Sequence, residues 1–415
     1  MESYKEFKPS NVHWIGYIPK HWEIKQLRSF LSLFTDKGHG DAQLLSVTRE
    51  QGVIVRNKDD KEENHNFVPE DLSGYKYIEK GDFAINKMKA WQGSYAVSDY
   101  NGIVSPAYFT CKLRGVNKDF FSRAIRSRAY IPFFTQYSKG IRVDQWDLNP
   151  NALKIIPFFL PPIPEQEKIV SYLDSKTSNI DAYVAEKEKE LQLLNELKES
   201  EISNVVTRGL NPDVMMKDSG ISWIGMIPEH WDTRRVKYLY ELITSKSHSQ
   251  IKIGLENIES FSGRYIPSDN EFDGDGIDTK VNDIVYGKLR PYLCKVWLAE
   301  WECNAVGDFY VFRCKSVLTP EYSKLIFLSS QFTDICTAST YGAKMPRVSS
   351  SFIQSQHFPV PPIEEQRAIV SYIEAKCAKI NSLISDIEAE IEYLKEYKQR
   401  LIADCVTGQI CVMNK

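Results

Sequence analysis

The most regular hydrophobic pattern in the chain is an alternation of steps of four and three residues. Its positions near the C-terminus are Ile373, Cys377, Ile380, Ile384, Ile387, Ile391, Leu394, Lys398, Leu401 and Cys405. The same spacing occurs earlier at Leu173, Thr177, Ile180, Val184, Lys187, Leu191, Leu194 and Lys198. This spacing is the a/d seam of a coiled coil, so both stretches are predicted to be long helices.

The predicted helices run from about Glu165 to Arg208 and from about Glu364 to Thr407, and Gly209 and Gly408 end them. Neither helix can bury its apolar stripe alone. Equal length and a shared register favour antiparallel pairing of the two helices within one chain. A zipper between two chains, or two plain core helices, remains the alternative.

The intervening segments, 24–158 and 233–358, have a different pattern. Short β-rich runs at 44–47, 53–55, 83–86, 284–286 and 309–312 alternate with turns. One helix is predicted in each segment, beginning near Asp119 and near residues 319–321. The fold class is therefore α+β, with two α+β domains separated by two long helices that form an antiparallel coiled coil.

The chain also contains an internal duplication. Residues 10–23 and 219–232 are identical at 8 of 14 positions, and residues 161–176 and 361–376 at 10 of 16. The order is a first domain at 1–160, a helix at 161–209, a second domain at 210–360 and a helix at 361–415. This organisation predicts internal pseudo-twofold symmetry. The repeated tryptophans, with His21 and His230, are expected to seal each domain against a helix rather than bind a ligand.

Composition narrows the possible functions. The chain has 415 residues, with 52 Lys and Arg against 55 Asp and Glu, so any contact with nucleic acid must be local. Its eight cysteines form no C-x-x-C pair, which argues against zinc fingers and favours reduced thiols in the cytoplasm. No apolar run is long enough to suggest a membrane span. Phosphate-loop, dinucleotide, zinc-protease and amino-methyltransferase motifs are missing, so we expect no catalytic activity.

Two stretches are locally basic and could meet DNA. Six basic residues against one acidic residue lie between Lys112 and Arg128, and four against one between Lys280 and Lys295. Aromatic and amide side chains accompany Lys87, Lys89 and Lys288. Arginine and lysine hold phosphates or read guanine, and amides read adenine. A solvated basic face explains any single patch equally well.

Taken together, the motifs resemble the specificity subunit of type I restriction-modification enzymes. The resemblance rests on the two W-I-G-x-I-P-x-H-W segments, the two P-P-I-x-E-Q helix starts followed by I-V-S-Y, and the ends V-T-R-G-L and V-T-G-Q-I. It covers essentially the whole chain. The resemblance implies a non-catalytic DNA reader with two target-recognition domains, each contacting one half of a bipartite double-stranded target.

The resemblance also implies partners and cofactors. The chain would bind two methyltransferase subunits, which hold S-adenosylmethionine, and would recruit restriction subunits that use ATP and Mg²⁺ to translocate and cut DNA. It would bind no cofactor or metal itself. A coiled-coil scaffold that holds protein partners without reading DNA is the alternative, and a fused specificity module is a second one.

By position, the resemblance assigns DNA contacts to three loop regions in each domain. In the first domain the candidates are Thr48, Arg49, Gln51, Lys87, Lys89, Trp91, Gln92, Lys139 and Arg142. In the second domain they are Glu256, Asn257, Lys288, Arg290, Tyr292, Lys344 and Arg347. The target sequence itself does not follow from these residues.

Overall fold

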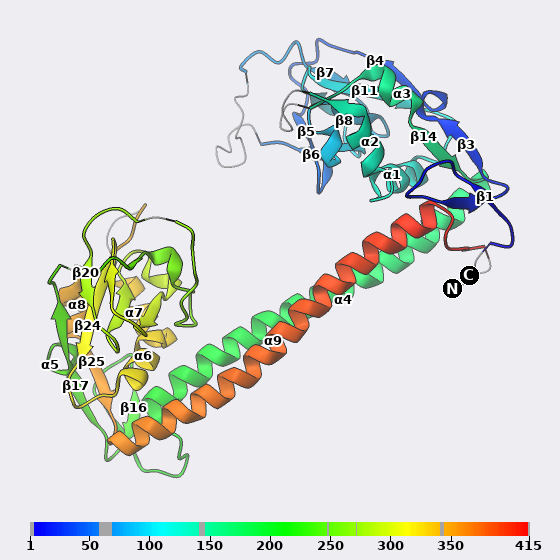
Figure 1. The fold of residues 1–415 in the computed structure, drawn as a ribbon. Helices are drawn as coiled ribbons and strands as arrows, with labels where there is room; N and C mark the ends of the chain where they lie inside the picture. Colours follow the sequence, from blue (N-terminus) through cyan, green and yellow to red (C-terminus); the bar gives the residue numbers. More distant parts are fainter. Residues whose placement is uncertain are drawn as a thin grey trace. The chain divides into compact units, whose positions relative to one another are not determined.

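The computed structural model describes residues 4–57, 69–140, 146–246, 249–270, 272–340 and 344–413. The chain forms two compact units, one of residues 1–186 with 390–415 and one of residues 187–389. Each unit therefore holds one α+β domain with part of each long helix, and both chain ends belong to the first unit (Figure 1).

The first domain is built on a four-stranded antiparallel sheet with the order β4-β11-β8-β9. These strands are Leu31–Phe34, Tyr108–Leu113, Phe83–Asn86 and Tyr95–Val97. Smaller pairs are β5 (Leu45–Thr48) with β6 (Gly52–Val55), β7 (Lys76–Ile78) with β10 (Gly102–Val104), and β12 (Ser138–Lys139) with β13 (Asp147–Leu148). Phenylalanines from the sheet and from α1 (Lys118–Arg126) fill the core, which explains the aromatic content of this segment.

The second domain repeats this topology. Its main sheet has the order β18-β24-β21-β22, with strands Tyr240–Ile243, Phe309–Cys314, Ile284–Gly287 and Val296–Leu298. A three-stranded sheet adds β19 (Lys252–Ile253), β23 (Cys303–Ala305) and β20 (Ile277–Thr279). The predicted β-rich runs all fall on or within one residue of strands, and the α+β assignment is confirmed.

Each domain contains more helices than the single one predicted from the sequence. The predicted helices are α1 (Lys118–Arg126) and α6 (Pro320–Leu328), and the side chains of Asn117 and Thr319 cap their N-termini. The structure adds α2 (Ile131–Tyr137), α3 (Pro150–Ile155), α5 (Val236–Leu239), α7 (Ser330–Ala338) and α8 (Ser350–Ser355). The α2 segment is rich in aromatic residues, so its composition suggests a strand, and burial against the core overrides that preference.

The long helices are α4 (Ile163–Arg208) and α9 (Ile363–Val406), within two residues of the predicted bounds. In each unit they lie side by side and antiparallel (Figure 1). In the first unit Asp181 accepts from Lys398 at 2.6 Å and 2.7 Å, and in the second Lys198 donates to Asn381 at 3.1 Å. The predicted seam is the buried face, with Ile380, Ile387 and Ile391 at most 6% exposed. Intramolecular pairing is therefore confirmed.

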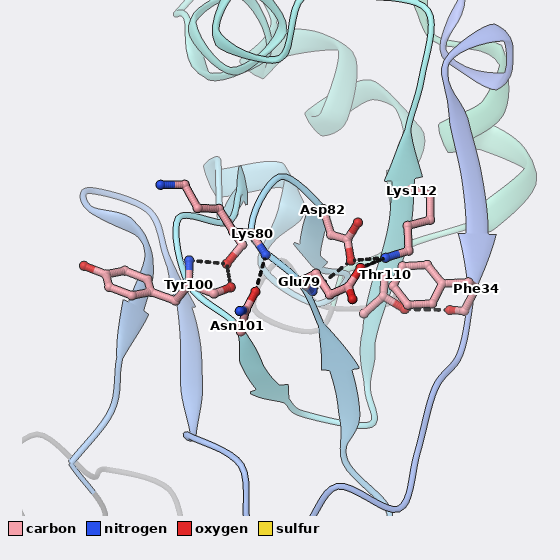
Figure 2. A network of polar contacts seen from close by, with 9 residues as sticks. Phe34, Glu79, Lys80, Asp82, Tyr100, Asn101, Thr110 and Lys112 are labelled. Carbon is pink, nitrogen blue, oxygen red and sulfur yellow. Dashed lines mark hydrogen bonds and ion pairs between the residues drawn. The ribbon is translucent and has the colours of Figure 1, made fainter.

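An ion pair between a buried aspartate and a partly exposed cation of the main sheet is common to both domains. Figure 2 shows Lys112 on β11 donating to Asp82 at 2.9 Å and to Glu79 at 2.8 Å. In the second domain Arg313 on β24 forms two hydrogen bonds with Asp283, at 2.8 Å and 2.7 Å. Both aspartates are buried, so each needs its cation in place. Asp82 directly precedes β8 and Asp283 directly precedes β21, so the two aspartates occupy one structural position.

Candidate nucleic-acid interface and helix junctions

A glutamate in the first turn of each long helix connects the helix to its domain through side-chain hydrogen bonds. We call this set of contacts the lock. In the first unit the Glu165 carboxylate accepts from Trp22 Nε1 at 2.9 Å and contacts His21 Nε2 at 2.8 Å. The Tyr4 hydroxyl donates a third bond, at 2.6 Å. Burial, followed by the neighbouring carboxylate, raises the pKa of Tyr4, which keeps the phenol protonated as the donor.

The second unit has the same lock without the tyrosine. Glu365 accepts from Trp231 Nε1 at 2.9 Å and contacts His230 Nε2 at 2.6 Å. The sequence interpretation of a seal between domain and helix is thus confirmed for Trp22, Trp231 and the two histidines, whose acidic partner is the glutamate of each P-P-I-x-E-Q motif.

The next residue of that motif ties the helix start to the recognition domain. Gln166 Oε1 accepts from the backbone N–H of Asn117, the N-cap of α1, at 2.9 Å. Gln366 Oε1 accepts from Thr319, the N-cap of α6, at 2.8 Å. Because α1 and α6 pack on the main sheets, this amide connects the start of each long helix to the core of its domain.

Each junction also includes the end of the other long helix. Gly408, just after α9, has a φ of +73° and lies so close to Pro19 that a Cβ would meet its ring at 2.2 Å. Gly209, just after α4, has a φ of +72° and faces Trp231. Only glycine combines this left-handed backbone with such a close approach. We call the two places where the start of one long helix, a tryptophan and the end of the other long helix meet the first and second junctions. They are Trp22, Glu165 and Gly408 with their contacts, and Trp231, Glu365 and Gly209 with theirs.

The predicted DNA-contact loops of the first domain meet around the short helix η2 (Ala90–Gln92). Lys87 forms an ion pair with Asp147 at 2.7 Å, and the Lys87 carbonyl accepts from Leu148. Trp91 packs against Trp146 with ring centroids 5.4 Å apart. Gln92 is half-buried, whereas the side chains of Lys89 and Lys139 are exposed. Two of the three predicted regions therefore form one surface.

The third region is the turn between β5 and β6, which holds Thr48, Arg49 and Gln51. The Thr48 hydroxyl bonds the backbone of this turn, and the Arg49 side chain is 67% exposed. Arg126 donates to the carbonyls of Arg49 and Glu50, which holds the turn beside α1. The Arg49 side chain also lies beside Gly93, the residue that follows η2. Arg142 lies outside the described residues.

The second domain has an equivalent cluster around η5 (Pro291–Leu293). Arg347 forms two hydrogen bonds with Asp308, at 3.1 Å and 2.9 Å, and Lys288 lies 3.7 Å from the same carboxylate. Hydrogen bonding to Arg347 is the main cause that lowers the pKa of Asp308, so the Asp308 carboxylate at the centre of the cluster stays ionised. The side chains of Arg290, Tyr292 and Lys344 are exposed.

Arg290 has an unusual backbone. Its φ of +50° lies in the left-handed region, and its N–H donates to the carbonyl of Pro346 at 2.8 Å. A non-glycine residue held in this way is uncommon and occurs mainly where the surroundings enforce it. The bond to Pro346 therefore fixes where the exposed guanidinium leaves the loop.

One predicted contact is wrong. Asn257, on η4 (Leu255–Asn257), is 1% exposed; its side chain accepts from Gly254 N–H and donates to the carbonyl of Ile266. It therefore shapes its loop and is not available to a base. Its neighbour Glu256 is exposed and accepts from Asn270. Nearby, Lys295 donates to the carbonyls of Leu255 and Ile258, and burial lowers its pKa.

The basic stretch from Lys112 to Arg128 serves mainly the fold. Lys112 pairs with Asp82, Arg123 with Asp174 of α4, and Arg128 lies 4.0 Å from Glu396 of α9. Most of the local excess of positive charge in this stretch is thus used in contacts within the first unit.

Sequence reasoning missed the acidic partners of the candidate cations and the glutamates of the junctions. Asp147 and Asp308 are distant in sequence from Lys87 and Lys288, so no local pattern links them. For Glu165 and Glu365 a signal existed, because both motif copies keep His-Trp and Glu-Gln while their neighbours differ.

Within the described ranges, no three His, Cys, Asp or Glu side chains come together as a metal site would require. The helices of that part of the chain include none with the length and apolar content of a membrane span.

Known structures share this architecture. A chain from a structural study of complex assembly and conformational transition of the type I R-M system superposes with a TM-score of 0.67 and 13% identity, covering 95% of this chain and 99% of that one. The HsdS subunit of Thermoanaerobacter tengcongensis gives a TM-score of 0.50 and 14% identity, covering 95% and 98%. The fold is thus that of a duplicated specificity subunit.

Sequence comparison leads to the same class. The family described as "Type I restriction modification DNA specificity domain" matches residues 273–393. The EcoDI specificity subunit of Escherichia coli is 21% identical over 95% of this chain and 90% of its own length. The MjaVIII specificity subunit of Methanocaldococcus jannaschii is 21% identical over 100% and 98%. The matching domain and these full-length similarities indicate a type I restriction-modification specificity subunit, with the role of DNA-specificity subunit. The scaffold alternative finds no support.

Proposed function

We propose that each recognition domain reads one half of a bipartite duplex target with its clustered loops. The observation that carries this proposal is the repeated cluster around η2 and η5, where cationic and aromatic side chains surround one half-buried aspartate. Exposed cations such as Lys139 and Arg290 would hold phosphates. Ion-paired side chains such as Lys87 and Arg347 would be oriented by their aspartates toward base edges.

We also propose that the two junctions dock two methyltransferase subunits. These regions keep the same residues in both halves of the chain, whereas the loops of the domains differ. One type of partner that binds twice needs one surface presented twice. The exposed imidazoles of His21 and His230, held by Glu165 and Glu365, would contribute to such a surface in both units.

The cofactors in this proposal belong to the partners. The methyltransferase subunits would hold S-adenosylmethionine for adenine methylation, and restriction subunits would hold ATP and Mg²⁺. Because chromosomal DNA and these small molecules are found together in the cytoplasm, we place the complex there.

Methylome sequencing tests the proposal. A host that expresses this chain with its methyltransferase subunits should methylate one bipartite sequence, and a host without the chain should not. Exchanging the second recognition domain, residues 233–358, for that of another specificity subunit should change one half of the target only. A change in both halves of the target, or methylation that does not require the chain, would refute the proposal that each domain reads one half.

A further inference from the structure

The second junction contains a cavity of about 200 Å³. His230, Glu365, Pro228, Gly209, Val214 and Ala368 contribute to its wall. Two of these side chains, His230 and Glu365, belong to the lock that holds the helix start. The cavity thus lies on the surface that we propose for partner docking, and the inference below rests on that proposal.

At the first junction a tyrosine occupies the equivalent place. The ring of Tyr4 lies 5.7 Å from the ring of His21 and 6.1 Å from that of Trp22, and its hydroxyl donates to Glu165. Cys411, from the segment after α9, is 9% exposed and close enough to influence the pKa of Tyr4. An aromatic phenol and the C-terminal segment therefore fill the first junction.

The repeat identifies what is missing at the second junction. β1 (Phe7–Pro9) pairs with β2 (Tyr17–Pro19) in the same register as β15 (Met216–Asp218) with β16 (Met226–Pro228). Tyr4 stands three residues before β1, and Asp213, which is exposed, stands three residues before β15. The second repeat thus keeps the acceptor and the histidine but lacks the phenol.

The difference leaves the second glutamate accessible and with spare acceptor capacity. The side chain of Glu165 is 4% exposed and has three donors around it, whereas that of Glu365 is 41% exposed and is contacted by His230 and Trp231. A carboxylate offers about four lone-pair sites, so Glu365 can accept a further bond.

We propose that the second junction is a phenol-binding pocket that receives a tyrosine side chain from the docked methyltransferase subunit. The ring would pack against His230, and the hydroxyl would donate to Glu365, as Tyr4 does to Glu165. The first junction is closed to such a side chain because Tyr4 already occupies it. The two docking surfaces therefore differ in this one contact.

Ligand-observed NMR of the full chain with p-cresol tests the pocket by itself. A phenol of this size should bind with a dissociation constant of ~1 mM, and toluene, which lacks the hydroxyl, at least fivefold more weakly. Ala368→Leu, which narrows the pocket, and Asp213→Tyr, which supplies the tyrosine of the first repeat, should each weaken p-cresol binding at least tenfold. Lys168→Leu, at the position equivalent to Ala368 in the first repeat, should leave it unchanged. Equal binding of p-cresol and toluene, or unchanged binding by both pocket variants, would overturn the proposal.

Native mass spectrometry of the co-expressed complex tests the source of the tyrosine. Asp213→Tyr should lower occupancy by the second methyltransferase subunit, whereas Lys168→Leu should not. Two fully bound partners on Asp213→Tyr would refute the tyrosine contact while leaving the docking role intact. Failure of the unmodified chain to bind two partners would instead refute the docking role. Dimerisation of the isolated chain that Ala368→Leu abolishes would assign the pocket to a second copy and overturn the proposal.

Discussion

Trp22 donates its indole hydrogen bond to Glu165 across 143 residues of sequence, at 2.9 Å. This single contact joins the segment before the first domain to the first turn of the helix that follows it. Trp231 and Glu365 repeat the relationship in the second unit. The two copies differ in depth, because Glu165 is buried and Glu365 is half-exposed.

We expect Glu165→Gln to destabilise the protein more than Glu365→Gln. In Glu165→Gln the new amide NH₂ would face one of three hydrogen-bond donors inside the protein, which costs about 2–3 kcal/mol. In Glu365→Gln water can hydrogen-bond the groups that lose their partner, so the cost is about 1 kcal/mol. Urea unfolding followed by circular dichroism measures both. Glu364→Gln, on the solvent side of the same helix turn, is the control. Equal losses of stability in Glu165→Gln and Glu365→Gln would contradict the role of side-chain burial.

Asn257→Ala should lower stability and leave the target sequence unchanged. The substitution leaves the buried Gly254 N–H without its partner, which costs about 1–3 kcal/mol, and it also removes the part-buried hydrogen bond to the Ile266 carbonyl. Thermal unfolding of the chain measures the loss. Methylome sequencing of the variant complex shows whether the modified sequence is the same, and a relaxed base preference at one position would contradict the structural role.

Lys139→Ala and Arg290→Ala should weaken binding to duplex DNA without unfolding the protein. If each side chain holds one phosphate, the slope of log K against log salt should fall by about one for each variant. If either reads a base, binding should instead fall by about 1–3 kcal/mol at one base pair. Lys25→Ala removes the same charge from β3 (Glu23–Gln26), in the segment that leads into the first domain, and serves as the control. Parental binding by both loop variants would show that the cluster is not the DNA surface.

The ion pair of Asp308 with Arg347 predicts a pH dependence. Because the pKa of Asp308 in the folded protein is lowered, its contribution to stability is present above about pH 4 and is lost as the pH falls through the lowered value. Asp308→Asn should therefore cost about 1–2 kcal/mol at pH 7, and the difference from the parent should shrink in acid. Denaturant unfolding at pH 7 and pH 3 measures this. A difference that grows toward pH 3 would refute the assigned direction.

Much of the architecture could be read from the sequence because it depends on periodicity and repetition. The seam residues from Ile373 to Cys405 determine one face of a helix by local spacing alone, and the glycines after each helix determine its end. The repeat then extends the conclusions about the long helix, its start and its end from one half of the chain to the other.

The remaining features depend on contacts between distant residues. Asn257 looks like a base-reading amide, and only the fold shows that Gly254 and Ile266 use both of its polar atoms. Arg347 looks like an unengaged cation until β24 brings Asp308 beside its loop. Local sequence gives the kind of side chain at a loop, but the partner that engages it is determined by tertiary packing.

The last prediction concerns the distance between half-sites. α4 and α9 each pass from one unit into the other, so their length should set the spacer. Four residues added to a helix extend it by about 6 Å, and DNA rises about 3.4 Å per base pair, so the extension corresponds to about two base pairs. The insertion belongs in both helices, after Leu194 and after Leu383, because Lys198 pairs with Asn381 nearby.

Methylome sequencing of this variant should show the same two half-sites with a spacer longer by one or two base pairs. Four residues are close to one helical turn, so most of the a/d seam is kept. The control replaces the four residues before each insertion point with the inserted sequence, at constant length, and should keep the original spacer. If the extended complex still methylates at the original spacing, the partners rather than the helices position the two domains.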